Sequence, residues 1–366
     1  MKRNYIEAFS QNTRSNNIAQ ADQANSFESL IMRYENIASN YKTLKQFDKQ
    51  IEVLDILISY APKNASYHFN RGNALYALRD LPSAIISYNE AIRLDPNNAS
   101  FHNCKGNALY VLKDFYGAIS EFNQAIGLNS KNASYHCNKG HALYALKDFD
   151  GAISEFNQAI EKDPNNASFH NYKGNVLYPL KRFGDAILSY NEAIRLDSDN
   201  RSYHCNRGSA LYALKDFDGA IKELDIAIEK DPDNASYHFN RGSALFELED
   251  FDGAISEFNQ AIGLDSKNAS YHYHKGKALY ALKDFYRAIS EFNQAIGLNS
   301  KNASFHNCKG NALYALKDFY GAISEFNQAI GLNSKNASYH YHKGKALYAL
   351  KDFYGAIKEL DIAIEK

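Results

Sequence analysis

Apolar and small residues recur along most of the chain at helical spacing. In residues 65–98, one set includes Tyr67, Ala74 and Leu75, and a second set begins at Leu81. Residues three or four positions apart lie on the same face of a helix, so each set predicts an amphipathic helix. Only a short polar connection separates the two sets. The pattern therefore predicts a pair of helices joined by a tight turn.

The residues that flank the two sets are typical helix-end residues. Asn64 and Asp80 each precede a set, and their side chains can accept a hydrogen bond from the first turn of a helix. Pro82 falls in the first turn of the second helix, where a missing N–H is harmless, and Pro96 helps to end that helix. Residues 65–98 are thus predicted to form a helical hairpin that buries its apolar faces only against neighbouring hairpins.

Glycine recurs with a period of 34 residues, and an alanine follows each glycine twelve positions later. The glycines are Gly72, Gly106, Gly140, Gly174, Gly208, Gly242, Gly276, Gly310 and Gly344. A fixed period of 20–50 residues is typical of stacked supersecondary units. A glycine inside a helix costs about 1 kcal/mol relative to alanine, so its recurrence suggests a close helix approach. We expect the backbones to meet at Gly72 and Ala84.

These residues resemble the tetratricopeptide repeat family, whose pattern has Gly at position 8, Ala at 20, an aromatic residue at 24, Ala at 27 and Pro at 32. Residues 65–98 supply Gly72, Ala84, Tyr88, Ala91 and Pro96. The match recurs in nine units that start at residues 65, 99, 133, 167, 201, 235, 269, 303 and 337. The resemblance implies an all-α fold, a right-handed superhelical α-solenoid of two-helix repeats.

The N-terminal part of the chain departs from this pattern. Residues 31–64 resemble a degenerate repeat, in which Gln50 replaces the key alanine. Residues 1–30 are rich in Asn, Gln and Ser, which predicts a polar tail that is partly disordered or helical. We therefore expect a tail, one degenerate repeat and nine repeats that run to residue 366.

Three polar residue types recur on the predicted inner side of the repeats. Histidine occupies position 4, and Lys or Arg occupies position 7, from His68 and Arg71 onwards. We expect neutral histidines at a helix interface, with a pH-responsive ladder as the alternative hypothesis. A metal site is not expected, because one histidine per repeat cannot converge on one ion. The position 7 cations are expected to reach the glutamates of the second helix, which are Glu121, Glu155, Glu223, Glu257, Glu291, Glu325 and Glu359.

Positions 2, 5, 6, 9, 12 and 13 cluster on the opposite side of the first helix, which the resemblance implies to be the concave groove. Aromatic rings at position 12 and amides at positions 6 and 9 suit an extended peptide, because amides match its backbone groups. This amide ladder is similar to that of the protein O-GlcNAc transferase superhelix. The predicted peptide-binding residues are Asn70, Asn73, Tyr76, Asn107, Tyr110, Asn138, His141, Tyr144, Asn175, Tyr178, Asn206, Tyr212, Asn240, Phe246, Tyr280, Asn311, Tyr314 and Tyr348.

Composition argues against several other classes of partner. The formal net charge of −1 favours neither nucleic acid nor an anionic membrane. The chain contains no apolar run long enough for a transmembrane helix, and its start lacks a signal-peptide core. The four cysteines sit at positions too far apart for disulfides, which indicates a reducing, cytoplasmic location. Near-identical repeats resemble arrays of some intracellular bacteria, so delivery into a host cell by a non-Sec route is an open alternative.

The sequence also lacks the motifs of catalysis. It contains no P-loop, no G-x-G-x-x-G and no C-x-x-C, so neither enzymatic activity nor a cofactor is expected. We predict a protein–protein interaction scaffold that binds an extended peptide or partner segment. Two alternatives stay open: a substrate-recruiting region of a larger enzyme such as a glycosyltransferase, and an array that associates with itself through uncapped ends.

Overall fold

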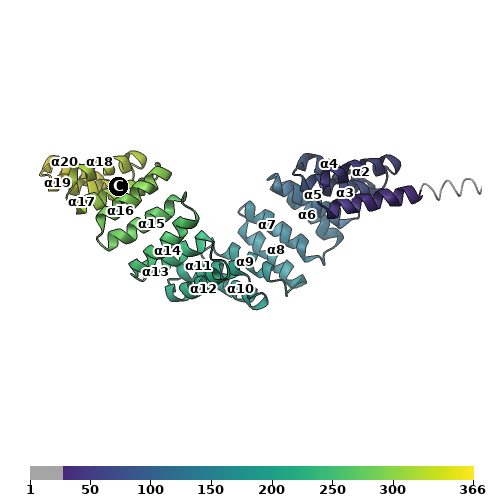
Figure 1. Ribbon diagram of the computed structural model, residues 1–366, viewed down its shortest axis with the longest axis horizontal. Coiled ribbons are helices and arrows are strands. Elements are labelled where there is room, and N and C mark those ends of the chain that lie inside the picture. Colours follow the sequence, from purple (N-terminus) through teal and green to yellow (C-terminus); the bar gives the residue numbers. More distant parts are fainter. Residues whose placement is uncertain (1–27) are drawn as a thin grey trace, which may run out of the picture. The chain divides into compact units, whose positions relative to one another are not determined.

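A computed structural model describes residues 28–366 of the chain, which form helices and no strand (Figure 1). Most of the predicted polar tail lies outside the described residues. Residues 28–30 belong to a helical stretch that runs to residue 43. The chain divides into two compact units, Met1–Phe169 and His170–Lys366. The boundary falls within α9 (Ala167–Leu177).

The described part of the first unit contains the helical stretch through residue 43 and seven further helices. The seven helices are α2 (Phe47–Tyr60), α3 (Ala65–Ala77), α4 (Leu81–Leu94), α5 (Ala99–Val111), α6 (Phe115–Leu128), α7 (Ala133–Ala145) and α8 (Phe149–Lys162). Each helix from α2 to α7 packs against the helix that follows it. Leu54 and Leu57 of α2 are buried.

The second unit continues the same alternation of paired helices. Its helices after α9 are α10 (Phe183–Leu196), α11 (Arg201–Ala213), α12 (Phe217–Lys230), α13 (Ala235–Glu247), α14 (Phe251–Leu264), α15 (Ala269–Ala281), α16 (Phe285–Leu298), α17 (Ala303–Ala315), α18 (Phe319–Leu332), α19 (Ala337–Ala349) and α20 (Phe353–Glu365). The predicted all-α class with helices in consecutive pairs is therefore confirmed. The exact repeat boundaries stay a prediction.

Side-chain caps begin the helices as expected. The Oδ1 atom of Asn64 accepts a hydrogen bond from the Ser66 N–H of α3, and the Asp80 side chain accepts one from the Ser83 N–H of α4. These bonds satisfy backbone donors that have no partner within the helix. The same caps recur at α5 and α6 and along most of both units. α9 ends at Leu177, earlier than the other first helices, because Pro179 cannot continue the helical hydrogen bonds.

The turn within each pair is one feature that the sequence pattern did not predict. A single residue there has a left-handed backbone, as at Arg79 with a φ of 66°. The next N–H, that of Asp80, donates to the Leu75 carbonyl at 3.0 Å and closes a Schellman-type helix end. Glycine usually takes this conformation, whereas here it is taken by Lys45, Arg79, Lys113, Lys147, Lys181, Lys215, Glu249, Lys283, Lys317 and Lys351.

The recurring glycines make room for a ring rather than for an alanine. A Cβ atom on Gly310 would lie 2.5 Å from the Cε1 atom of Phe326, and one on Gly72 would lie 2.6 Å from the Cε1 atom of Tyr88. The expected meeting of Gly72 with Ala84 is therefore wrong as the main contact. Where the ring is replaced by Leu224, the alanine carbonyl does come close, at 3.3 Å from a Cβ on Gly208.

Candidate peptide-binding face

The first helices of successive pairs contact one another, as α3 contacts α5 and α5 contacts α7 in the first unit. In the second unit, α11, α13, α15, α17 and α19 form the same succession. We call the surface formed by positions 2, 5, 6, 9, 12 and 13 of these helices the first-helix face. Every predicted peptide-binding residue is half-buried or exposed there, and none is buried.

The aromatic residues at position 12 are held from one side by the next helix. The Tyr110 ring centroid lies 5.5 Å from that of Phe115, and the Tyr280 centroid lies 5.3 Å from that of Phe285. Edge-on packing of this kind fixes the ring orientation. The rings stay partly accessible, and Tyr144 and Tyr280 are 40% and 38% exposed. The structure thus presents rigid aromatic surface on this face.

Part of the amide ladder is used within the protein. The Asn138 side-chain amide donates to the Asn103 Oδ1 atom at 2.8 Å, and the Asn206 amide makes the same contact with Asn171. Position 6 of one repeat therefore bonds to position 5 of the repeat before it. At position 9, the Asn73 Oδ1 atom accepts a hydrogen bond from the Tyr88 hydroxyl at 2.9 Å. These contacts were not predictable from the repeat pattern, because they depend on how side chains of different helices meet.

Other amides on the face keep their full hydrogen-bonding capacity. Asn70, Asn107 and Asn311 are half-buried, and their side chains make no hydrogen bond within residues 28–366. Each such amide offers two N–H donors and a carbonyl acceptor at a fixed place. These three residues are therefore the best-placed amides for pairing with the backbone of a bound peptide.

One hollow on the face brings together three of the predicted residues. It is a pocket of about 250 Å³ between α13, α15, α16 and α17. Two polar residues that the sequence analysis did not select, Lys277 and Cys308, also line it. Lys277 occupies position 9, where several other repeats have asparagine. This departure from the pattern is the feature that could have identified it from the sequence. The lining residues are Phe246, Lys277, Tyr280, Ala281, Phe292, Cys308 and Asn311.

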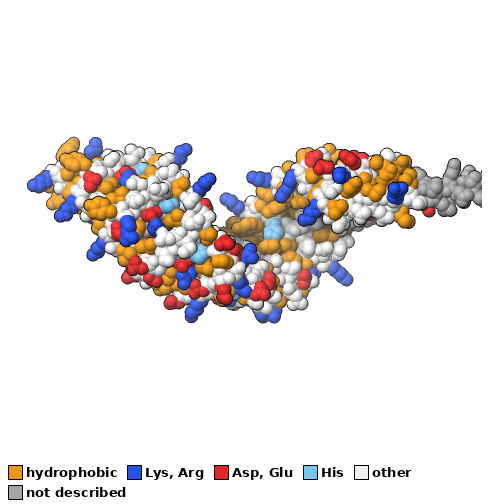
Figure 2. Space-filling model, in the orientation of Figure 1, with side chains coloured by type: hydrophobic (Ala, Val, Ile, Leu, Met, Phe, Trp, Pro, Cys, Tyr) orange, Lys and Arg blue, Asp and Glu red, His pale blue; other side chains and the backbone are white. Residues whose placement is uncertain are grey.

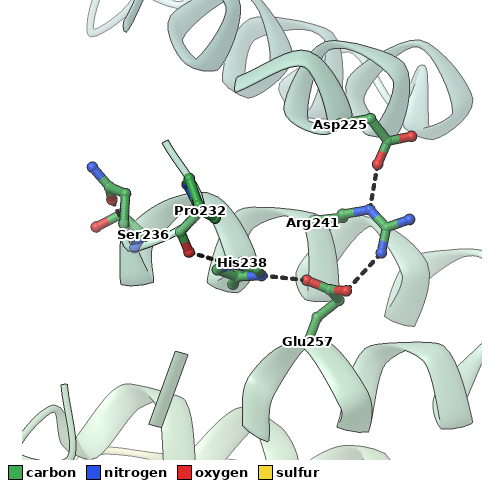
Figure 3. A network of polar contacts seen from close by, with 7 residues as sticks. Asp225, Pro232, Ser236, His238, Arg241 and Glu257 are labelled. Carbon is green, nitrogen blue, oxygen red and sulfur yellow. Dashed lines mark hydrogen bonds and ion pairs between the residues drawn. The ribbon is translucent and has the colours of Figure 1, made fainter. Parts of the chain in front are cut away.

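A polar network recurs on the side of the first helices that carries positions 4 and 7, which we call the inner side. Figure 3 shows this network around His238. The Nδ1 atom of His238 lies 2.8 Å from the Oε2 atom of Glu257, and Arg241 donates to the Oε1 atom at 2.7 Å. The Nε2 atom of His238 lies 2.9 Å from the Pro232 carbonyl oxygen. A neutral imidazole has one N–H and can donate in only one of these contacts, whereas a protonated ring can donate in both.

This arrangement confirms the predicted glutamate partners. His, Glu and Lys or Arg meet in seven pairs, and the glutamates are Glu121, Glu155, Glu223, Glu257, Glu291, Glu325 and Glu359. At Glu359, burial alone would raise the carboxyl pKa, but the bonds from Lys343 and His340 outweigh it and lower the pKa. In the repeat that starts at residue 65, Arg71 bonds to Ser87 and Asp55 instead.

Three histidines outside this network differ in their surroundings. Burial lowers the pKa of His141, and burial together with a nearby lysine lowers the pKa of His274 and His342. His274 lies edge-on to the rings of Phe239 and Tyr273. These side chains occupy positions 6 and 9 of the first-helix face. Burial of these three imidazoles favours a pH dependence that arises from the first-helix face.

The charge distribution on the surface gives little further indication of the kind of partner. On the side of the molecule that Figure 2 shows, acidic and basic side chains are interspersed over the described residues. None of the described helices is both long and apolar enough to cross a membrane. Across residues 28–366, no group of three or more His, Cys, Asp or Glu side chains is placed to hold a metal ion.

The paired helices, their ring-against-glycine contacts and their regular period define an α-helical repeat protein. A family model described as the tetratricopeptide repeat matches residues 103–167, 137–201, 205–269 and 245–303. A second model, described as the TPR repeat, matches residues 72–113 and 310–351. The chain belongs to the tetratricopeptide repeat family and has its scaffold fold.

Solved structures share this fold at low sequence identity. The Cut9 and Hcn1 hetero-tetramer of the APC/C is 17% identical with a TM-score of 0.55, covering 81% of this chain and 58% of that one. A tetratricopeptide repeat protein from Parabacteroides merdae is 14% identical with a TM-score of 0.54, covering 68% and 98%. PilF of Pseudomonas aeruginosa is 20% identical with a TM-score of 0.51, covering 58% and 97%. A search of curated proteins gave no match.

Proposed function

We propose that this protein is an interaction scaffold whose first-helix face binds an extended segment of a partner protein. The observation that carries the proposal is the occurrence of half-buried rings and uncommitted amides on the same helices. Asn70 lies on the same helix as Tyr76, Asn107 on the same helix as Tyr110, and Asn311 on the same helix as Tyr314. Within residues 28–366 none of these three amides has a hydrogen bond, so a ligand backbone meets no competitor there.

The physical argument favours an extended peptide over a folded surface. An extended chain leaves its backbone N–H and C=O groups unpaired, and amide side chains at intervals can bond to them. The rings of Tyr110 and Tyr314 contribute apolar area with little loss of side-chain entropy, since Phe115 and Phe319 already restrain them. The bonds from Asn138 to Asn103 and from Asn206 to Asn171 serve instead to hold neighbouring repeats in register.

The proposal places this binding role in the cytoplasm. Its support is the state of the cysteines, which are all free in the described structure, namely Cys104, Cys137, Cys205 and Cys308. Burial raises the pKa of the Cys104 thiol to about 11 and that of the Cys137 thiol to about 12, so both are protonated and weakly reactive at neutral pH.

The test compares partner recovery by the intact chain and by a variant with Tyr76, Tyr110 and Tyr144 changed to alanine. The variant should recover markedly less of the partner from a cell extract, because it loses three rings of the face. A matched control changes Tyr116, Tyr286 and Tyr320, each 77% exposed on second helices, and should recover as much as the wild type. Equal recovery by all three proteins would reject the proposal.

A second candidate function, self-association, is favoured by the last helix of the described structure. Ile357 and Ile364 of α20 are 60% and 82% exposed. The corresponding residues of α18, Ile323 and Ile330, are half-buried beside the next pair. A second copy could cover the exposed residues in the same way. Light scattering should then show a mass that rises with concentration, and a change of Ile357 and Ile364 to Lys should abolish the rise.

A further inference from the structure

The pocket beside Lys277 has the size and walls to receive one large apolar side chain. Its volume of about 250 Å³ is below the range of about 300–1,000 Å³ that is usual for complete small-molecule sites. The rings of Phe246, Tyr280 and Phe292 form most of its apolar lining. A hollow of this kind in a peptide-binding face is suited to a single side chain of the peptide.

Lys277 brings a positive charge to this pocket without a partner for it. Its Nζ atom lies 4.8 Å from the centroid of the Phe246 ring, and it forms no ion pair within residues 28–366. No acidic residue lines the pocket. The thiol of Cys308 does not supply a negative charge either, because burial raises its pKa. Lys277 is therefore the only charged side chain among the lining residues at neutral pH.

A second lysine on the same helix, Lys275, forms an ion pair within the protein. Lys275 lies two residues before Lys277, and its Nζ atom is 2.5 Å from the Oε1 atom of Glu291. The other position 7 lysines of the polar network are paired with a glutamate in the same way, namely Lys105, Lys139, Lys309 and Lys343. The fold thus supplies carboxylates to the inner side and none to the pocket. An unpaired, half-buried lysine favours a negatively charged group in the ligand.

Asn311 adds a third recognition element. Its side chain lines the same pocket and has no hydrogen bond within the described part of the chain. The pocket therefore combines an apolar hollow, one unpaired cation and one free amide. These match a large apolar side chain, a carboxylate and a backbone peptide group that lie close together in a ligand.

We propose that the pocket holds a large apolar side chain of a bound peptide, while Lys277 pairs with the carboxylate of an adjacent aspartate or glutamate in that peptide. This inference rests on the proposed function, because it assigns a ligand chemistry to one part of the first-helix face. Asn311 then bonds to the peptide backbone between the two side chains. The partner segment is an acidic and apolar motif inside a chain.

The experiment measures the affinity of the full chain for four fluorescent heptapeptides by anisotropy. Three have glycine and serine flanks, amidated ends and a central phenylalanine–aspartate, phenylalanine–asparagine or alanine–aspartate pair. The fourth ends in phenylalanine with a free carboxylate. The phenylalanine–aspartate peptide should bind about 10-fold more tightly than the asparagine peptide, because a charge-assisted bond is replaced by a neutral one.

The key variant is Lys277→Asn, which should fold normally because position 9 is asparagine in other repeats, including Asn107 and Asn311. It should bind the aspartate and asparagine peptides equally. The matched control is Lys345→Asn, which removes a similar cation that lies 5.5 Å from the Tyr314 ring centroid but is exposed on α19. This control should keep the 10-fold preference for aspartate.

The location of binding is read from Cys308. In a chain with Cys104, Cys137 and Cys205 changed to serine, the aspartate peptide should slow alkylation of Cys308, since this thiol lines the pocket. An unchanged alkylation rate at saturating peptide would overturn the assignment. Equal or tighter binding of the peptide with the terminal carboxylate would overturn the internal acidic residue as the recognised group.

The outcomes also separate this inference from the proposed function. If the aspartate and asparagine peptides bind equally to the wild type and Tyr280→Ala weakens both, the face binds peptides and the inference is wrong. If no peptide binds and the tyrosine variants recover the partner as well as the wild type, the proposed function fails too. An aspartate preference that Lys277→Asn does not remove also overturns the role of Lys277.

Discussion

Residues of the same type have different surroundings on the inner side and on the first-helix face of this protein. Lys275 and Lys277 are both half-buried on α15, yet Lys275 is paired with Glu291 and Lys277 has only a ring beneath it. The inner side repeats its network in seven helix pairs, whereas the face varies from one pair to the next. The comparison shows that the repeated contacts belong to the packed inner side, whereas the departures from the pattern gather on the face for which we propose recognition.

The same contrast separates the faces of the two units. At positions 2, 5, 6, 9, 12 and 13, the repeats that start at residues 65, 99 and 133 have no charged side chain. In the second unit, Lys277 and Lys345 occupy position 9 of their repeats, and Glu247 occupies position 13. The face of these three repeats of the first unit is therefore neutral, whereas the face of the second unit carries charges of both signs. The proposed preference for a negatively charged ligand is confined to the pocket beside Lys277.

The largest expected effect comes from breaking the network on the inner side. Glu257→Ala removes the carboxylate partner of His238 and one of the two carboxylate partners of Arg241, which keeps Asp225, in a place where the glutamate side chain is only 14% exposed. We expect a loss of about 2 kcal/mol in local stability, because buried polar groups left unpaired are costly. Hydrogen exchange of amides in α13 and α14 measures it, since unfolding of a repeat array need not be two-state.

The control for this change is Glu229→Ala, which removes an exposed glutamate from α12. It should alter stability by less than about 0.5 kcal/mol. If both variants exchanged at the same rates, the network would contribute nothing to the stack and the contrast between the two sides would fail.

A smaller effect, with opposite signs at two sites, comes from the glycines of one helix pair. Gly310→Ala places a Cβ atom 2.5 Å from a Phe326 ring atom, so overpacking should outweigh the gain in helix propensity and cost about 1 kcal/mol net. Gly331→Ala meets nothing within 4 Å and should stabilise the pair by up to about 1 kcal/mol. Denaturant midpoints of the two variants should move in opposite directions. A stabilising Gly310→Ala would contradict the close ring packing.

The smallest effect is a dependence of stability on pH that arises from the face. The pKa values of His141, His274 and His342 are lowered in the folded state, so the unfolded chain binds more protons as the pH falls. Their contribution to stability is complete well above pH 6.5 and is lost as the pH falls through that value. Each of these histidines contributes at most about 1.4 kcal/mol per pH unit to the slope.

The measurement compares melting temperatures of the wild type and of a variant with these three histidines changed to asparagine, between pH 7.5 and 5. Other repeats have asparagine at the same positions, as at Asn107 and Asn138, so the variant should fold. The wild type should lose more stability on acidification than the variant. Parallel curves would show that the face does not sense pH in this range.

Much of the fold was predictable because its causes are local or repeat with the period. The Asn64 and Asp80 caps act on atoms two or three residues away, and helical periodicity marks the buried side of each helix. The partnership of the position 7 cations with glutamates was also predictable, since both residues recur with the same spacing. The left-handed residue at Arg79 was not, because a lysine or arginine carries no signal for that conformation.

The candidate site was predictable in its outline and unpredictable in its detail. The aromatic positions and the amides Asn70, Asn107 and Asn311 are half-buried or exposed, and their role in binding stays a prediction. The amide of Asn138 is engaged with Asn103, which is 35 residues away in the chain. The pocket beside Lys277 was missed, because it exists only where side chains from four helices meet.

The sequence therefore determined the helices, their ends and their pairing, because these depend on neighbours within a few residues and on a period that brings equivalent residues together. The tertiary structure decided which amides have no partner within residues 28–366, which side chain fills the space beside each repeat glycine, and that Lys277 has no counter-ion among those residues. These outcomes depend on the exact approach of side chains from different helices. A pattern along one chain specifies which residues recur, whereas the distances between them arise only when the helices are packed.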